Sequence, residues 1–188
     1  MRRPRVLIVN RGEIALRIAQ SAYDLNIEPV VIHCESDRVL LDSVSGIADI
    51  VEIPGKGATA YLDTERLMEV ASDLKCDLVH PGYGFLSENA DFAEEVEKSG
   101  KTWVGPKVEQ LKLFGNKLTA IEHAQKCGVP VLRSSGILKE LDELEGYLSE
   151  FSAGKGFLLK AAFGGGGRGI REVNAKTDLK KAFSLAQG

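Results

Sequence analysis

The residues with the clearest chemical potential surround four consecutive glycines, Gly164–Gly167. Lys160 precedes this run, and Arg168 and Arg171 follow it. Glycine backbones approach an anion closely and adopt positive φ without strain, and successive N–H groups in such a loop form a concave site for phosphate oxygens. Lys160 and Arg168 would add full positive charges to those dipoles. The pattern favours phosphate binding, although a flexible glycine hairpin without a ligand would have the same composition.

Apolar residues lie on both sides of the glycine run, at 157–159 before it and at Ile170 and Val173 after it. A mere linker would be rich in serine and glycine on both sides. We therefore predict two short strands joined by a glycine loop over residues 157–173. A strand lysine taken alone is an ordinary solvated residue, so the motif around Lys160 decides its role.

The composition is that of an ordinary globular chain of 188 residues, with 44% hydrophobic and 27% charged residues. A net charge of -3 gives no sign of a nucleic-acid partner. No apolar run approaches the roughly 20 residues that span a bilayer. The cysteines and histidines are not spaced as metal ligands, so Cys34, Cys76 and Cys127 are predicted to be reduced, small apolar fillers. We predict a cytoplasmic protein with no membrane partner and no metal site in this chain.

Short apolar runs alternate with helical patterns through the first part of the chain, which predicts a parallel α/β sheet covered by helices on both faces. The first helix is expected to begin at Glu13 and to bury Ile14, Ile18, Ala22 and Leu25. The predicted strands are Arg5–Val9, Pro29–Cys34, Ile50–Ile53, Asp77–His80 and Thr102–Val104.

The carboxyl ends of these strands define the edge where parallel sheets bind ligands. That rule places Asn10–Gly12, Glu35 and His80–Gly84 along one rim. The first turn is not GxGxxG, so the dinucleotide fingerprint is missing. We therefore interpret Glu35 as a solvated residue rather than a ribose ligand, and His80 as a hydrogen-bonded structural residue rather than a general base.

Turn and cap signals divide the rest of the chain. Lys56–Ala58 is predicted to be a flexible turn, and Asp63 or Thr64, Asn89 and Asn116 are predicted helix caps. The pattern changes after Gly115, and we place a domain boundary at residue 130, giving domains 1–130 and 131–188. Helical faces are predicted for Leu141, Leu144, Leu148 and Phe151, and for Leu179, Ala182, Phe183 and Ala186.

Four stretches together resemble one family. They are VNRGEIALRI (Val9–Ile18), HPGYGFLSEN (His80–Asn89), FGNKLTA (Phe114–Ala120) and KAAFGGGGRGIR (Lys160–Arg171). Their order and spacing resemble the start of the biotin carboxylase component of biotin-dependent carboxylases, over essentially the whole chain.

The resemblance implies an ATP-grasp architecture, with a Rossmann-like N-terminal domain followed by part of the ATP-grasp lid subdomain. It implies a ligase that uses ATP, Mg²⁺ and bicarbonate to carboxylate biotin on a carrier domain, through carboxyphosphate. A homo-oligomer through the first helix is also implied. Arg17 matches the family there, but Gln20 stands where an arginine is common, which places that dimer in doubt.

The resemblance also implies roles for individual residues. Lys117 and Lys160 would bind ATP phosphates or position the adenine-side pocket, and Gly165, Gly166 and Gly167 would close over the phosphates. Arg168 would either contact phosphate or keep the loop soluble. A cation at a helix start, as at Lys117, is disfavoured by the helix dipole, and a bound phosphate would relieve that cost.

In the family, the metal-binding carboxylates, the catalytic base and the bicarbonate-binding arginine lie further along the chain. We therefore expect these residues to be an N-terminal fragment that holds no catalytic residue, is inactive alone and has mobile loop glycines. Phe163 is more like pyruvate carboxylases than bacterial acetyl-CoA carboxylases, and Asn116 replaces the usual aspartate.

Two other functions stay open at this point. The chain could be a non-catalytic assembly module that retains the fold, which a natural stop after Gly188 would support. It could also be another ATP-grasp ligase, which the pair of motifs at His80–Asn89 and Lys160–Arg171 disfavours. The acyl acceptor is not visible in these residues.

Overall fold

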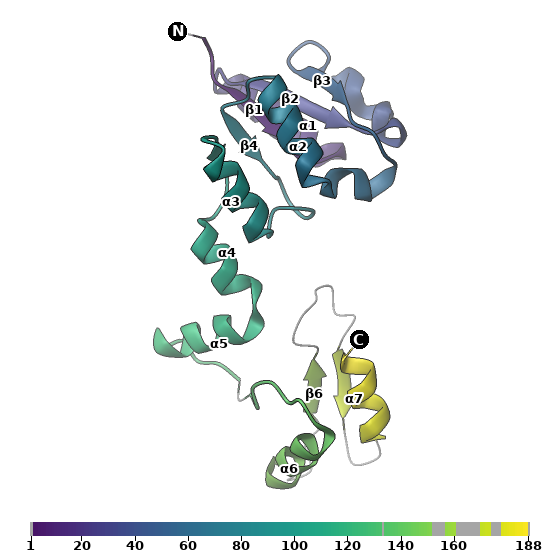
Figure 1. The fold of residues 1–188 in the computed structure, drawn as a ribbon, viewed down its shortest axis with the longest axis vertical. Helices are drawn as coiled ribbons and strands as arrows, with labels where there is room; N and C mark the ends of the chain where they lie inside the picture. Colours follow the sequence, from purple (N-terminus) through teal and green to yellow (C-terminus); the bar gives the residue numbers. More distant parts are fainter. Residues whose placement is uncertain (1, 133, 152–156, 161–169, 174–177, 188) are drawn as a thin grey trace. The chain divides into compact units, whose positions relative to one another are not determined.

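The computed structural model describes residues 2–132, 134–151, 157–160, 170–173 and 178–187. It divides into two compact units, Met1–Lys112 and Leu113–Gly188, which are described separately below. The predicted domain division at residue 130 stays a prediction. In order, the elements in Figure 1 are β1 (Arg5–Ile8), α1 (Gly12–Asp24), β2 (Glu28–His33), η1 (Glu35–Val44), β3 (Asp49–Glu52), η2 (Gly57–Leu62), α2 (Thr64–Asp73), β4 (Leu78–His80), α3 (Ala90–Lys98), β5 (Thr102–Trp103), α4 (Val108–Gly115), α5 (Lys117–Lys126), α6 (Leu141–Phe151), β6 (Phe157–Lys160), β7 (Ile170–Val173) and α7 (Leu179–Gln187).

The first unit is built on a parallel sheet with the strand order β3-β2-β1-β4-β5. The register pairs Leu7 of β1 with Val30 of β2 and with Val79 of β4. Each predicted strand is present, which confirms the α/β fold class. Their continuous apolar runs suit strands that are buried on both faces.

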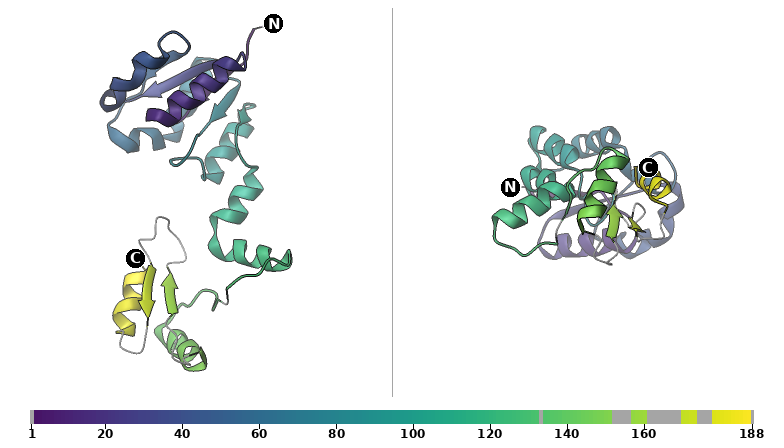
Figure 2. Two further views of the ribbon diagram at one scale, coloured as in Figure 1. Left: turned by 180° about the vertical axis from the view of Figure 1, so that it is seen from behind. Right: turned by 90° about the horizontal axis from the view of Figure 1, so that it is seen from below.

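Two separate cores lie on the two faces of this sheet, because successive side chains of a strand point to opposite faces. Val6 and Ile8 pack with α1, whereas Leu7 and Val9 pack with α2 and α3. Figure 1 shows α2 in front of the sheet, and the reverse view in Figure 2 shows α1 on the other side. The helices thus cover both faces and leave the strand ends as the exposed edges.

The buried face of α1 differs from the prediction. Ala15, Ala19 and Ala22 are its buried residues, whereas Leu25 is 72% exposed. Leu25 follows the last turn of the helix, and Ile14 and Ile18 are only half-buried. Small alanines sit where the helix comes closest to the strands, so the larger side chains are displaced to the margins of the contact.

Helix N-termini follow the predicted caps. Asp63 accepts a hydrogen bond from Arg66 N, Asn89 from Phe92 N and Asn116 from Leu118 N. Each bond satisfies an N–H that lacks a partner within its helix. The turn predicted at Lys56–Ala58 is instead the entrance to the 3₁₀ helix η2, whose Ala60 and Tyr61 are buried.

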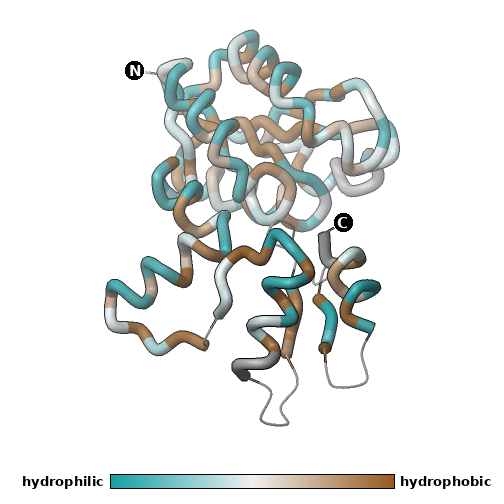
Figure 3. Tube along the Cα trace, turned by 60° about the horizontal axis from the view of Figure 1, so that its bottom comes forward, coloured by the Kyte–Doolittle hydropathy of each residue, from teal (hydrophilic) through white to brown (hydrophobic). Residues whose placement is uncertain are grey.

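The second unit contains the predicted hairpin. Strands β6 and β7 pair antiparallel, with Lys160 opposite Ile170, and α7 packs against both strands. Leu144 of α6 and Ala182 and Phe183 of α7 are buried, which confirms the prediction for these three residues. The side chains of Phe151 and Ala186 lie outside the described residues. Figure 3 shows the alternation of apolar and polar residues along these helices. In the described part of the chain, no helix is both long and apolar enough to cross a membrane.

Candidate functional site

The carboxyl edge of the sheet is organised by one buried amide, that of Asn10. Asn10 follows β1 and is 1% exposed. Its Nδ2 donates to the carbonyl oxygens of Pro81 (2.8 Å) and Tyr83 (2.9 Å), and its Oδ1 accepts from Arg11 N (2.9 Å). The predicted meeting of the first turn and the turn after β4 is therefore confirmed.

This contact lies between β1 and β4, where the strand order reverses direction. Doubly wound folds bind dinucleotides in the crevice at that point. Here the amide of Asn10 ties the two turns together.

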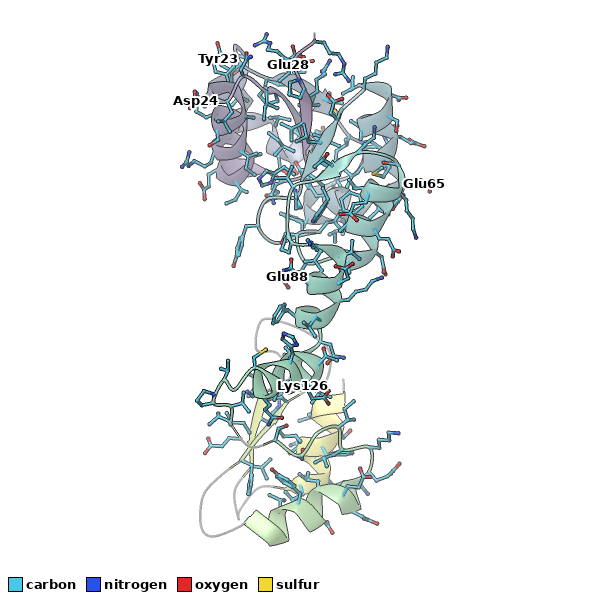
Figure 4. The ribbon with its side chains drawn as sticks, turned by 90° about the vertical axis from the view of Figure 1, so that its left-hand side faces the viewer. Tyr23, Asp24, Glu28, Glu65, Glu88 and Lys126 are labelled. Carbon is cyan, nitrogen blue, oxygen red and sulfur yellow. The ribbon has the colours of Figure 1, made fainter. Side chains whose placement is uncertain are left out.

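The turn at residues 81–84 is tightly constrained. Gly82 and Gly84 have φ values of +69° and +71°, and Gly82 N donates to Nδ1 of His80 at 3.0 Å. Tyr83, between the glycines, is 80% exposed. Figure 4 shows Glu88, just beyond the turn, at the end of the first unit opposite Glu28 of β2. Tyr83 and Glu88 are therefore presented outward at the carboxyl edge.

His80 is a structural acceptor, as predicted, and burial lowers its pKa. The unfolded chain takes up a proton as the pH falls through about 6.5, while the folded imidazole stays neutral until its lower pKa is reached. The unfolded state then binds more protons than the folded state. The free energy of unfolding should therefore decrease as the pH is lowered through that window. A stability that rises instead between pH 6.5 and 5.5 would contradict this.

The matched control for the pH dependence is His80→Asn, because asparagine Oδ1 accepts a hydrogen bond from Gly82 N and does not titrate. Urea unfolding at several pH values, followed by fluorescence of Trp103, should show a smaller loss of stability at low pH for this variant. Equal pH profiles for the two proteins would remove His80 from the explanation.

A second network joins η1, η2 and the start of α1 at the same edge. Asp37 Oδ2 accepts from the hydroxyl of Tyr61 (2.9 Å), the thiol of Cys34 (3.3 Å) and Nη1 of Arg11 (3.3 Å). Tyr61 is fully buried, and its hydroxyl also accepts from Cys34 N at 3.3 Å. Burial, and next the Asp37 carboxylate, raise the pKa of Tyr61 well above its usual value. The Tyr61 hydroxyl thus keeps its proton and donates it in the hydrogen bond to Asp37.

A small cavity adjoins this network, lined in part by Arg11, Gly12, Ala15, His33, Asp37 and Tyr61. Small-molecule sites occupy roughly 300–1,000 Å³ and converge a few polar groups on open space. Here the polar groups point at one another. We therefore interpret the network as a structural link between η1, η2 and the start of α1. Glu35, beside it in the sequence, is exposed, as predicted.

The predicted ATP-binding lysines are both in the second unit. Lys117 is the first residue of α5 and is exposed, and Lys160 is the last residue of β6 and is exposed. The residues predicted to cradle phosphate, Gly165, Gly166, Gly167 and Arg168, lie outside the described residues, as does Phe163. Among the residues that the structure does describe, no three acidic, histidine or cysteine side chains are grouped to hold a metal ion.

Comparison with known families decides the relationship. The model of the family described as "Biotin carboxylase, N-terminal domain" matches residues 2–111, more than half of the chain. The chain belongs to the biotin carboxylase family. Its parallel sheet with helices on both faces is the fold of that family's N-terminal domain.

Curated biotin carboxylase relatives match along nearly the whole chain. Pyruvate carboxylase of Bacillus subtilis is 40% identical over 97% of the chain, which spans 16% of that relative. Biotin carboxylase of Pseudomonas aeruginosa is 40% identical over 97% of the chain, which spans 41% of that relative. The chain thus corresponds to an N-terminal part of such proteins and covers less than half of their length.

A solved biotin carboxylase domain shares the fold. The domain from the 2-oxoglutarate carboxylase of Hydrogenobacter thermophilus superposes with a TM-score of 0.88 and 36% identity, over 99% of this chain and 41% of that one. That structure is a dimer in complex with MgADP, ADP and bicarbonate.

Sequence reasoning missed the network around Asp37. Its members come from the three separate segments around residues 11, 34–37 and 61, and no spacing rule links them. A detectable signal was present: Tyr61 lies between the apolar residues Ala60 and Leu62, and a buried tyrosine needs a hydrogen-bond partner.

Proposed function

We propose that residues 1–188 form the N-terminal and lid part of a biotin carboxylase that works in the cytoplasm. The enzyme would use MgATP and bicarbonate to carboxylate biotin on a carrier domain, within a carboxylase of the pyruvate or acyl-CoA type. The observation that carries the proposal is the shared fold, at 36% identity, with a domain solved with MgADP and bicarbonate. That domain is a dimer, which supports a homo-oligomer here as well.

The chain's own contribution would be positive charge for the nucleotide. Lys160 presents an exposed amine at the end of β6, next to the glycine segment, and Lys117 presents another at the start of α5. Phosphoryl transfer depends mainly on positioning and charge stabilisation, which lysines and backbone amides supply. Gly165–Gly167 and Arg168 are proposed to complete the phosphate contacts. Mg²⁺, when bound, would neutralise charge on the phosphates.

Lys160→Ala tests the proposal in the intact carboxylase. We expect kcat/KM for ATP in bicarbonate- and biotin-dependent ATP cleavage to fall at least tenfold, about 1.4 kcal/mol. Lys180→Ala is the matched control, since Lys180 is an exposed lysine of α7 in the same unit. It should change the rate little. Equal rates for both variants would remove Lys160 from the site.

Two further outcomes bear on the function as a whole. The absence of any biotin-dependent ATP cleavage by the wild-type protein would contradict a biotin carboxylase and favour a non-catalytic assembly module. Residues 1–188 alone are expected to bind ATP weakly and to show no carboxylation, because the chain spans 41% of the biotin carboxylase relatives. Tight binding in an ATP titration would show that the nucleotide site lies within these residues.

A further inference from the structure

A thiol and an imidazole meet at the C-terminal end of α5. Cys127 Sγ lies 3.6 Å from His123 Nε2, within hydrogen-bond reach for sulfur. The two residues are four apart on the helix, so their side chains share one face. Both are exposed. Figure 4 labels Lys126, the residue immediately before Cys127, and so marks this end of the helix.

The backbone holds the two residues of this pair in place. Cys127 N donates to the carbonyl oxygens of His123 (3.0 Å) and Ala124 (3.2 Å). Gly128, with a φ of +74°, then ends the helix and donates to Gln125 O at 2.9 Å. Cys127 is thus the C-cap of α5, held by backbone hydrogen bonds.

The imidazole is oriented by an aromatic contact. The ring of Phe114 meets that of His123 at a centroid distance of 6.1 Å and an interplanar angle of 90°. Such an edge-to-face contact is a favourable geometry for two aromatic rings. Nε2 therefore faces the sulfur without the pair being enclosed, so a reagent can approach the thiol.

The other two thiols differ from Cys127 in their burial, and the sulfur of Cys34 also differs in its hydrogen-bond partner. Cys34 and Cys76 are buried, at 0% and 3% exposure, and the sulfur of Cys34 donates to Asp37. Burial shields both sulfurs from attack, and it raises the pKa of the Cys76 thiol. Cys127 was predicted to be an apolar filler, and its exposure shows that this prediction was wrong.

We propose that Cys127 is a site of reversible thiol–disulfide exchange with low-molecular-weight disulfides such as oxidised glutathione, and that His123 is its base. His123 Nε2 accepts the thiol proton, and Cys127 Sγ attacks one sulfur of the disulfide. The new S–S bond joins Cys127 to one glutathione as the old S–S bond breaks. The leaving thiolate takes the proton from the imidazolium and departs as reduced glutathione, so atoms and electrons balance.

The inference does not depend on the proposed function, because no step uses ATP, bicarbonate or the glycine segment. It does place an adduct on α5, the helix that begins with Lys117. The adduct would extend from the opposite end of that helix. Reduction by excess thiol would restore the free cysteine.

The test is the rate of mixed-disulfide formation with oxidised glutathione at pH 7, followed by intact mass and peptide mapping of the folded protein. We expect the adduct on Cys127 and none on Cys34 or Cys76. His123→Gln should slow the reaction about tenfold, below the 10²–10⁴ that an enclosed catalytic base contributes. Gln125→Ala, on the same exposed helix, should leave the rate unchanged.

Reaction of the same proteins in denaturant supplies the reference, because unfolding separates the pair and exposes all three thiols. The rate difference between wild type and His123→Gln should disappear there, and circular dichroism should show that both variants fold. Three results would overturn the proposal: protection of Cys127 in the native protein, preferential labelling of a buried cysteine, or equal native rates for wild type and His123→Gln.

Discussion

Gly82→Ala should lower the free energy of unfolding of the first unit by about 3 to 5 kcal/mol. Gly82 has a φ of +69°, and a Cβ there would lie 2.7 Å from Asn10 Nδ2 and 2.9 Å from Ile14 Cγ2. Asn10 cannot retreat without losing its bonds to two carbonyl oxygens. The loss therefore combines an unfavourable left-handed backbone, an overpacked contact and broken buried hydrogen bonds.

Gly84→Ala separates these contributions. Gly84 has nearly the same φ, +71°, but a Cβ there would meet no atom within 4 Å apart from its chain neighbours. It should cost only the backbone contribution, about 1 to 2 kcal/mol. Urea unfolding followed by fluorescence of Trp103, the chain's one tryptophan and a buried residue of β5, measures both variants. Equal losses would show that Asn10 does not constrain the turn.

The sheet and its ligand-binding edge could be predicted because they depend on local patterns. Continuous apolar runs mark strands buried on both faces, and parallel strands bring their carboxyl ends to one edge. These two rules placed Asn10 near the turn that begins at Pro81, 71 positions away, and the bond from Asn10 Nδ2 to Pro81 O confirms it. The helix caps at Asp63, Asn89 and Asn116 could also be predicted, because each one bonds a backbone N–H only two or three residues along the chain.

Features that depend on tertiary contacts could not be predicted. A hydrophobic periodicity gives weight to large side chains, so it chose Leu25 over Ala15 and Ala19 for the buried face of α1. Close packing of that helix on the strands favours small residues instead. The exposure of Cys127 likewise depends on what covers α5, and none of the α5 residues is buried.

For the candidate nucleotide site, the sequence pattern predicted where Lys160 lies but not what it binds. Lys160 was predicted at the end of a strand, and the structure places it there, opposite Ile170. Its role in binding phosphate rests on a motif rather than on a contact, because a strand pattern specifies where a lysine lies and not what it binds. Lys160→Ala therefore tests the phosphate-binding role, which the strand pattern alone does not predict.

Asp37→Ala should destabilise the first unit by about 2 to 4 kcal/mol, because it leaves a buried phenol O–H without its acceptor. Tyr61→Phe removes that donor and deprives Cys34 N of its acceptor, at a cost of about 1 to 2 kcal/mol. Arg11→Ala is the surface control. The Arg11 side chain is 40% exposed, and its ion pair with Asp37 at 3.3 Å should contribute less than about 1 kcal/mol.

The double variant Asp37→Ala with Tyr61→Phe decides whether these residues act as one unit. Without the phenol there is no orphaned O–H, so the double variant should lose about 1 to 2 kcal/mol less than the two single losses added together. Unfolding in urea, again followed through Trp103, supplies all four free energies. Strict additivity would mean that the bond from the Tyr61 hydroxyl to Asp37 Oδ2, 2.9 Å long, contributes nothing to stability. A coupling of the expected size would show that η1 and η2 are locked to each other through a carboxylate that also holds the start of α1.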